Sequence, residues 1–237
     1  MKLNVLDKAD NEREIIDGDL RNIFVKGIFE NTCINISEEA WGLLKEGKIK
    51  IFLNHIGGVR CIDGFVFNIN SGAGVFRVNV GGGAPCYLSL GNKVSGKFDI
   101  TMYRGSRVSI GDNTTSNGCR IFCDNSHFTT GEDCMISDEV LFQTSDQHQI
   151  FNLDNGLVIN EKKGGIDLCK HVWIGRRSTL IGKFSVNAGA IVAAGSIVTR
   201  EVDENSIVAG NPAKKIKSNV SWSRNFGKID RYIQDLI

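Results

Sequence analysis

Proline is scarce in this sequence, with 2 residues among 237. Because proline cannot donate a backbone hydrogen bond within a sheet, this scarcity permits long, unbroken ladders of strands. An excess of one charge is also lacking, since 28 lysines and arginines face 27 aspartates and glutamates, which leaves a net charge of +1. Nucleic-acid-binding domains usually carry a clustered basic surface, so this balance argues against a nucleic-acid partner.

Long apolar runs are absent as well. No stretch approaches the roughly 18 apolar residues that a membrane span requires. The N-terminal sequence MKLNVLDKADNEREIID has no apolar core of a secretory signal. The 7 cysteines are odd in number and spread along the chain, which favours reduced thiols over a disulfide framework. We therefore expect a cytoplasmic protein without a membrane span.

Glycine, by contrast, is abundant, with 27 residues. Over residues 174–202, apolar side chains recur every six residues, which fits neither the period of about 3.6 of a helix nor that of about 2 of a flat strand. A hexad repeat is typical of a parallel β-coil, in which three short strands complete one turn. One predicted inward row consists of Ile174, Leu180, Val186, Val192 and Val198. A second row, mostly small or apolar, consists of Ser178, Phe184, Ala190, Ser196 and Val202.

The repeat also predicts the organisation of the chain. The repeat is missing before residue 57, degraded from Gly57 to about Ser145, interrupted by a polar stretch and regular afterwards. We predict an all-β fold, a parallel β-helix of hexapeptide repeats, with an α/β cap at the N-terminus and a helix at the C-terminus. The predicted boundaries are 1–57 for the cap, 58–205 for the β-helix, 145–171 for a long extruded loop within it, and 206–237 for the tail.

Both ends of the chain carry helix signals. Ser37 as N-cap and Gly47 just after the last turn frame a short helix in the cap, and a strand is predicted to follow over Lys48–Ile56. In the tail, apolar residues at helical spacing predict one helical face. These residues are Trp222, Phe226, Ile229, Ile233 and Ile237.

The candidate chemistry lies mainly in and beside the interruption. His148, in SDQHQIF, is either a general base, an effect worth about 10²–10⁴-fold when positioned, or an ordinary exposed histidine. Asp146 either orients that imidazole, as carboxylates do for catalytic histidines, or shapes a turn. Trp173, where the repeat resumes, is either a flat wall for a sugar ring or thioester arm or a packing residue. His171 is interpreted as an exposed turn residue.

Two further groups are candidates for ligand binding. One predicted corner of the coil carries almost no side-chain bulk, at Ala193, Ala194, Gly195 and Ser196. A long, thin ligand would fit against its backbone, although tight corners favour small residues in any case. Lys214 and Lys215 either neutralise a phosphate or are exposed tail lysines.

A zinc site is an alternative for Cys119, Cys123, His127 and Cys134. Their spacing matches no standard zinc pattern, and cysteine also suits a narrow core. We therefore expect no metal.

Four motifs together resemble the hexapeptide-repeat acetyltransferases, a family of left-handed parallel β-helices. They are SDQHQIF, HVWIG from His171, AAGSIVTREV from Ala193 and SIVAGNPAKKI from Ser206. The combination of the histidine loop with HVWIG is most similar to the bacterial sugar O-acetyltransferases, including those that act on capsular polysaccharide and polysialic acid. The family usually has proline after this histidine, whereas this chain has Gln149, a departure that affects the stiffness of the loop.

The resemblance implies a homotrimer with active sites between subunits and acetyl-CoA as donor. The pantetheine arm would lie against the small residues of 193–196, and the nucleotide phosphates near Lys214 and Lys215. His148 would accept the proton of a sugar hydroxyl, which attacks the thioester directly, while backbone N–H groups stabilise the oxyanion. The acceptor would be a capsular polysaccharide or sialic acid, and Trp173 would wall the site.

Two alternatives stay open. An N-acetyltransferase of an amino sugar nucleotide would share the fold and the donor. A non-catalytic β-helix scaffold would share the fold alone, but the combination of His148, Trp173 and the small-residue corner favours an enzyme.

Overall fold

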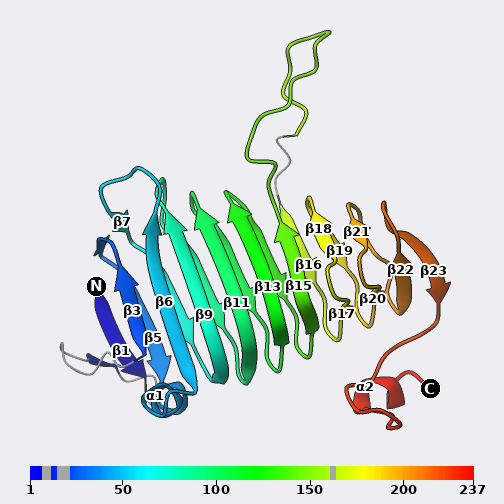
Figure 1. Ribbon diagram of the computed structural model, residues 1–237, viewed down its shortest axis with the longest axis horizontal. Helices are drawn as coiled ribbons and strands as arrows, with labels where there is room; N and C mark the ends of the chain where they lie inside the picture. The colour runs from blue at the N-terminus through cyan, green and yellow to red at the C-terminus, as the bar shows by residue number, and fades with distance from the viewer. Residues whose placement is uncertain (7–11, 15–21, 161–163) are drawn as a thin grey trace.

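The computed structural model describes residues 1–6, 12–14, 22–160 and 164–237. Strands stack side by side along the whole molecule, and the two termini lie toward opposite ends of the stack (Figure 1). The helices of the described residues are short: α1 (Glu38–Lys45) and α2 (Arg231–Gln234). Among these residues, no helix has the length and apolar character that crossing a bilayer requires.

Two long sheets contain nearly all of the strands. The first sheet contains, in spatial order, β19 (Phe184–Val186), β16 (Gly165–Leu168), β14 (His127–Thr130), β12 (Arg107–Ile110), β10 (Tyr87–Leu90), β8 (Val66–Ile69), β5 (Cys33–Ser37), β1 (Lys2–Leu6) and β2 (Glu12–Glu14). The second contains β23 (Lys214–Ser218), β22 (Ser206–Ala209), β20 (Ile191–Val192), β17 (Trp173–Ile174), β15 (Met135–Gln143), β13 (Thr115–Asp124), β11 (Val94–Tyr103), β9 (Gly72–Gly81), β6 (Ile49–Ile56) and β3 (Ile23–Lys26). Alongside it run β18 (Thr179–Ile181) and β21 (Ile197–Val198), and β4 (Phe29–Glu30) pairs separately with β7 (Ile62–Asp63).

Each regular coil has three sides. The strands β16, β17 and β18 form one coil, and β19, β20 and β21 pair in parallel with them in the next. The long strand β15 bends around a corner, because its Met135 end pairs with β17 whereas its Gln143 end pairs with β18. This arrangement confirms the predicted all-β class and the parallel β-helix. Its handedness stays an expectation from the family resemblance.

The hexad rows point inward as predicted. The exposed fraction is 0% for Ile174, Leu180, Val186 and Val192 and 2% for Val198. In the second row, Ser178, Ala190 and Ser196 are fully buried and Val202 is 2% exposed, while Phe184 packs half-buried against the core. A narrow aliphatic core therefore continues from coil to coil.

The N-terminal helix and strand signals are confirmed. Ser37 Oγ accepts a hydrogen bond from the Ala40 amide, as an N-cap does, and Gly47 has a φ of +73°, which favours glycine after a helix. The sheets do not stop at residue 57, however, because β5 pairs in parallel with β8 and β6 with β9. The loss of the hexad pattern thus marks less regular coils rather than the edge of the sheets, and the division into domains stays a prediction.

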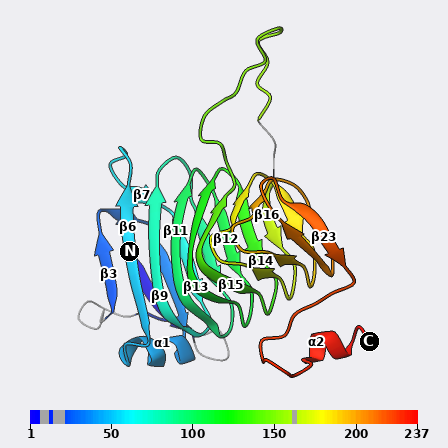
Figure 2. The ribbon, with the colours of Figure 1, turned by 45° about the vertical axis from the view of Figure 1, so that its right-hand side comes forward.

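The extruded loop is shorter than predicted. The predicted loop includes residues 165–171, but β16 pairs with β14 and buries Ile166 and Leu168 in the core. A single pair of apolar residues is too short to show a hexad row, which explains the error. The excursion therefore ends before Gly165, and it stands away from the stack between β15 and β16 (Figures 1 and 2).

The prediction of one helical face from Trp222 to Ile237 is wrong. Only Arg231–Gln234 is helical, capped by the side chain of Asp230, which accepts from the Ile233 amide. Phe226 is fully exposed, and Gly227 has a φ of +73°, which a helix does not accommodate. Trp222 is buried, but it lies in an extended segment before the helix.

Candidate active site

A cleft of about 910 Å³ opens at the base of the extruded loop. The loop contributes Ser145, Asp146, Gln147, His148, Gln149, Ile159, Asn160 and Gly164 to its lining. The coil contributes Arg104, Asp124, Asn125, Ser126, His127, Thr144, Gly182, Lys183 and Thr199. The lining is mostly polar, and a cleft with a histidine among convergent polar groups is the usual setting of an active site.

His148 and Asp146 both line this cleft. The Asp146 carboxylate accepts a hydrogen bond from Asn160 Nδ2 at 2.9 Å, and the same nitrogen donates to the His148 carbonyl oxygen at 2.8 Å. Asn160 therefore ties the two arms of the loop together at the level of the histidine. Asp146 contacts the histidine segment through this amide, so the orientation of the imidazole by Asp146 stays a prediction.

The floor of the cleft carries an ion pair that the sequence reasoning missed. Arg104 Nε donates to Asp124 Oδ1 at 2.7 Å, and Arg104 Nη2 donates to the second carboxylate oxygen. Asp124 is buried, and its carboxylate raises the pKa of Arg104 by accepting these hydrogen bonds. The signal that points to the pair is their separation of one coil, which puts both residues at the same corner.

A second pair borders the cleft where strand β14 of the first sheet begins. His127 Nε2 lies 3.1 Å from Asp167 Oδ2, and Thr129 Oγ1 donates to Asp167 Oδ1 at 2.5 Å. Sequence reasoning considered His127 only as a zinc ligand. The structure instead pairs it with a carboxylate on the neighbouring coil.

Trp173 lies at another corner of the coil. It pairs with Met135 at one end of β15, whereas the histidine loop leaves the other end, after Gln143. The indole Nε1 is 3.4 Å from Ser137 Oγ, and its ring lies 6.1 Å from that of Trp222. Within one chain, the structure does not bring Trp173 and His148 together.

The small-residue corner lies between β20 and β21. Ala194 and Gly195 are exposed, whereas Ser196 is fully buried. The Gly195 amide donates to the Arg176 carbonyl at 2.8 Å, and Ser178 Oγ donates to the Ala193 carbonyl at 3.0 Å. This corner therefore presents backbone to solvent with almost no side-chain cover.

Lys214 and Lys215 lie exposed on β23, at the C-terminal end of the coil. Lys215 Nζ lies 2.6 Å from Asp203 Oδ2. Both lysines line a hollow of about 170 Å³ together with Arg200. Three cationic side chains, Arg200, Lys214 and Lys215, thus line this hollow together with the two carboxylates of Glu201 and Asp203.

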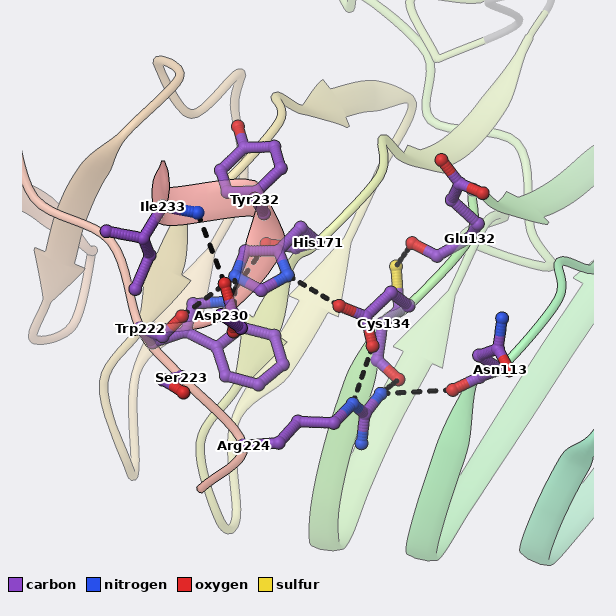
Figure 3. A network of polar contacts seen from close by, with 12 residues as sticks. Asn113, Glu132, Cys134, His171, Trp222, Ser223, Arg224, Asp230, Tyr232 and Ile233 are labelled. Carbon is purple, nitrogen blue, oxygen red and sulfur yellow. Dashed lines mark hydrogen bonds and ion pairs between the residues drawn. The ribbon is translucent and has the colours of Figure 1, made fainter. Parts of the chain in front are cut away.

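The structure corrects the interpretation of His171, whose side chain is 1% exposed. Its ring lies between two aromatic rings, with centroids 4.3 Å from Trp222 and 4.2 Å from Tyr232 (Figure 3). Asp133 accepts hydrogen bonds from His171 and Arg224. Burial raises the pKa of Asp133, but these two hydrogen bonds outweigh burial and hold the pKa below its usual value. The turn signal was correct, since His171 has a φ of +55°.

The alternative zinc set is not assembled. Cys119, Cys123 and Cys134 are buried in the coil, and burial raises the pKa of Cys119 and of Cys134 to about 12. Within the part of the chain that the structure describes, no three His, Cys, Asp or Glu side chains are grouped to hold a metal ion.

Known proteins resemble this chain in sequence and in fold. It is 38% identical over 139 residues to a polysialic acid O-acetyltransferase of Escherichia coli O1:K1 / APEC, a match that covers 58% of this chain and 45% of that protein. This chain thus spans less than half the length of that curated relative. No protein-family model matches the chain.

Two solved structures share the architecture. The polySia-specific acetyltransferase NeuO superposes with a TM-score of 0.76 at 26% identity, covering 91% of this chain and 90% of that one. The polysialic acid O-acetyltransferase OatWY shares the fold with a TM-score of 0.53 at 18% identity, covering 89% and 92%. The names of these relatives support the predicted acyltransferase class. In sequence and in fold, this chain is therefore similar to polysialic acid O-acetyltransferases, which agrees with the acetyltransferase family that its motifs predicted.

Proposed function

We propose that this protein is an acetyl-CoA-dependent O-acetyltransferase that acts on a hydroxyl of a bacterial surface sugar in the cytoplasm. The observation that carries the proposal is the position of His148, which lines the polar cleft at the base of the extruded loop. The similarity to polysialic acid O-acetyltransferases supports a sugar acceptor. The acceptor class that we favour is capsular polysaccharide or sialic acid.

The chemistry needs one base and no covalent intermediate. His148 would accept the proton of the acceptor hydroxyl as its oxygen attacks the thioester carbonyl. The new ester C–O bond forms, the C–S bond breaks, and the imidazolium returns its proton to the departing thiolate. Backbone N–H groups would stabilise the oxyanion of the tetrahedral intermediate. The thioester is already activated, so a nucleophilic serine or cysteine is unnecessary.

The donor would lie along the outside of the coil. Ala194 and Gly195 leave backbone exposed at their corner, which suits the thin pantetheine arm. Lys214 and Lys215 at the end of the coil would pair with the nucleotide phosphates. No metal takes part in this scheme.

The acceptor would occupy the cleft beside His148. Arg104 and Lys183 line it, and so does Asp124. Arg104 is already paired with Asp124, so Lys183 would be the group that meets the carboxylate of an acidic sugar such as sialic acid, and Thr199 would offer a hydroxyl partner. The preference for sialic acid rests on the similarity to the polysialic acid enzymes.

A homotrimer would complete the site. In one chain, His148 and Trp173 lie at different corners, so a second subunit would have to supply the missing wall. The extruded arm supports such an assembly because it exposes a group of large apolar side chains, which isolated soluble proteins rarely present together. They are Ile150 (49%), Phe151 (51%), Leu153 (97%), Leu157 (64%) and Ile159 (56%).

The direct test is thiol release from acetyl-CoA with a panel of acceptors: free sialic acid, polysialic acid, capsule oligosaccharides and simple galactosides. We expect release that depends on the acceptor and that falls at least about a hundredfold in His148→Ala. Equal turnover by His148→Ala would show that another group is the base. No release with any acceptor and no binding of acetyl-CoA would favour the scaffold alternative.

A further inference from the structure

The C-terminal segment after β23 is fastened to the coil around His171 (Figure 3). We call residues 219–236 the strap. Val220 donates its amide to the Asn205 carbonyl at 3.0 Å, and Tyr232 Oη donates to Asn205 Oδ1 at 3.3 Å. Trp222 is 5% exposed although it belongs to no strand or helix. The strap therefore packs on the corner of the coil where the first sheet passes into the second.

His171 is the centre of this contact. Nδ1 lies 2.7 Å from Asp133 Oδ2, and Nε2 lies 2.8 Å from the Trp222 carbonyl oxygen. Both ring nitrogens therefore have an oxygen partner, one on the coil and one on the strap. Asp230 Oδ2, also on the strap, lies 3.9 Å from Nε2. The Trp222 side chain also contacts the backbone of His171, since its Nε1 donates a hydrogen bond to the His171 carbonyl oxygen at 2.9 Å.

Arg224 is the second fastening. Its guanidinium donates to Asp133 at 2.6 Å and to Thr115 Oγ1 at 2.9 Å. It also donates to the carbonyl oxygens of Asn113 and Cys134, at 3.0 and 2.9 Å. Arginine is suited to this role because its planar fork presents several donors in fixed directions. One strap residue thus binds two successive coils.

The strap ends up beside Trp173. The rings of Trp222 and Trp173 lie 6.1 Å apart, tilted by 51°, which is an ordinary aromatic packing geometry. Trp173 is only two residues from His171, on the same coil. The residues that hold the strap and the Trp173 indole are therefore in direct contact with one another.

We propose that the strap is a positioning element of the active site: Trp222, held by His171 and Arg224, fixes the orientation of the Trp173 indole. This inference rests on the proposed function, in which Trp173 walls the site for thioester and acceptor. Trp222, His171 and Arg224 are positioning residues, since they act through Trp173. A merely structural strap would stabilise the fold without any special dependence on that indole.

The kinetic test is a double-mutant cycle on the full chain. Trp222→Ala is expected to lower kcat about tenfold, and Trp222→Phe, which keeps an aromatic ring, to recover most of it. In a Trp173→Ala background, Trp222→Ala is expected to change kcat less than about twofold. Equal losses in both backgrounds, or no loss in either, would overturn the proposal. Phe226→Ala is the matched control, because it removes a fully exposed aromatic ring from the same strap.

A spectroscopic test is independent of activity. The chain has 3 tryptophans, so fluorine NMR of 5-fluorotryptophan protein should give three resonances, assigned by single Trp→Phe variants. Arg224→Gln is expected to shift or broaden the Trp173 resonance and to leave Trp41, at the far end of the coil, unchanged. An unchanged Trp173 resonance would overturn the proposal. If the wild type transfers no acetyl group, the proposed function fails while this test still decides whether the strap orients Trp173.

Discussion

His148 and Trp173 are attached to opposite ends of β15: Trp173 pairs with Met135, and the loop that carries His148 follows Gln143. A single chain thus separates the two residues that the family motifs assign to one active site. The separation is informative because it makes the proposed active site depend on assembly.

Subunit mixing tests this dependence. We expect His148→Ala and Trp173→Ala chains, each nearly inactive alone, to regain about a quarter of wild-type activity when refolded together in equal amounts, because random cyclic assembly places an intact His148 beside an intact Trp173 at that fraction of interfaces. Mixing each variant with itself is the control. Mixtures that stay inactive would mean that one chain supplies the whole site.

The proposed donor site makes a prediction for the lysines of β23. Lys214→Ala and Lys215→Ala should each raise the KM for acetyl-CoA about tenfold, because a paired cation is lost from a phosphate. The same variants should leave the KM for acetyl-pantetheine, which lacks the nucleotide, unchanged. Lys217→Ala, an exposed lysine on the same strand, is the matched control. A similar rise with both donors would argue that these lysines do not face phosphates.

The buried cysteines should be chemically inert. Burial raises the pKa of Cys119 and Cys134 to about 12, so at pH 8 both remain thiols, and the thiolate is the reactive form. Iodoacetamide at pH 8 should leave both unmodified in the native protein and modify all 7 cysteines in denaturant, as peptide mass spectrometry would show. Rapid native labelling of either residue would contradict the packed coil.

Asp133 should make the strap sensitive to acid. Its pKa is lowered in the folded protein because hydrogen bonds from His171 and Arg224 outweigh the effect of burial. The stabilisation is therefore present above the ordinary carboxylate pKa, near 3.8, and is lost as the pH falls through the lower folded value. Urea unfolding between pH 6 and pH 2.5 should show a steeper loss for the wild type than for Asp133→Asn. Asp154→Asn is the control, because Asp154 is an exposed carboxylate, and this variant should lose stability as steeply as the wild type does.

The sequence predicts most of the scaffold because a hexad row repeats the same inward side chain in each coil. Ile174, Leu180 and Val192 could be assigned to the core from spacing alone, and all are buried. The short pair Ile166 and Leu168 could not, because two residues define no row. The helical spacing of apolar residues in the tail predicted a helix that does not form. Gly227 interrupts the segment, and Trp222 is buried by its indole while its backbone is extended.

The candidate site divides in the same way. A motif identifies His148, and the cleft contains it. Arg104 and Asp124 could be recognised only once the coil length set them at one corner, because each alone is an ordinary charged residue. His171 looked exposed since turns usually are, and the partners that bury it come from a segment about 50 residues later in the chain.

The identity of the product tests the central claim most directly. Polysialic acid or a capsule oligosaccharide incubated with acetyl-CoA and the wild-type protein should gain an acetyl group on oxygen, detected by mass and by proton NMR and removed by mild alkali. The same incubation with His148→Ala should give no product. An alkali-stable amide would identify an N-acetyltransferase, and an ester formed equally well by His148→Ala would contradict the role of this histidine.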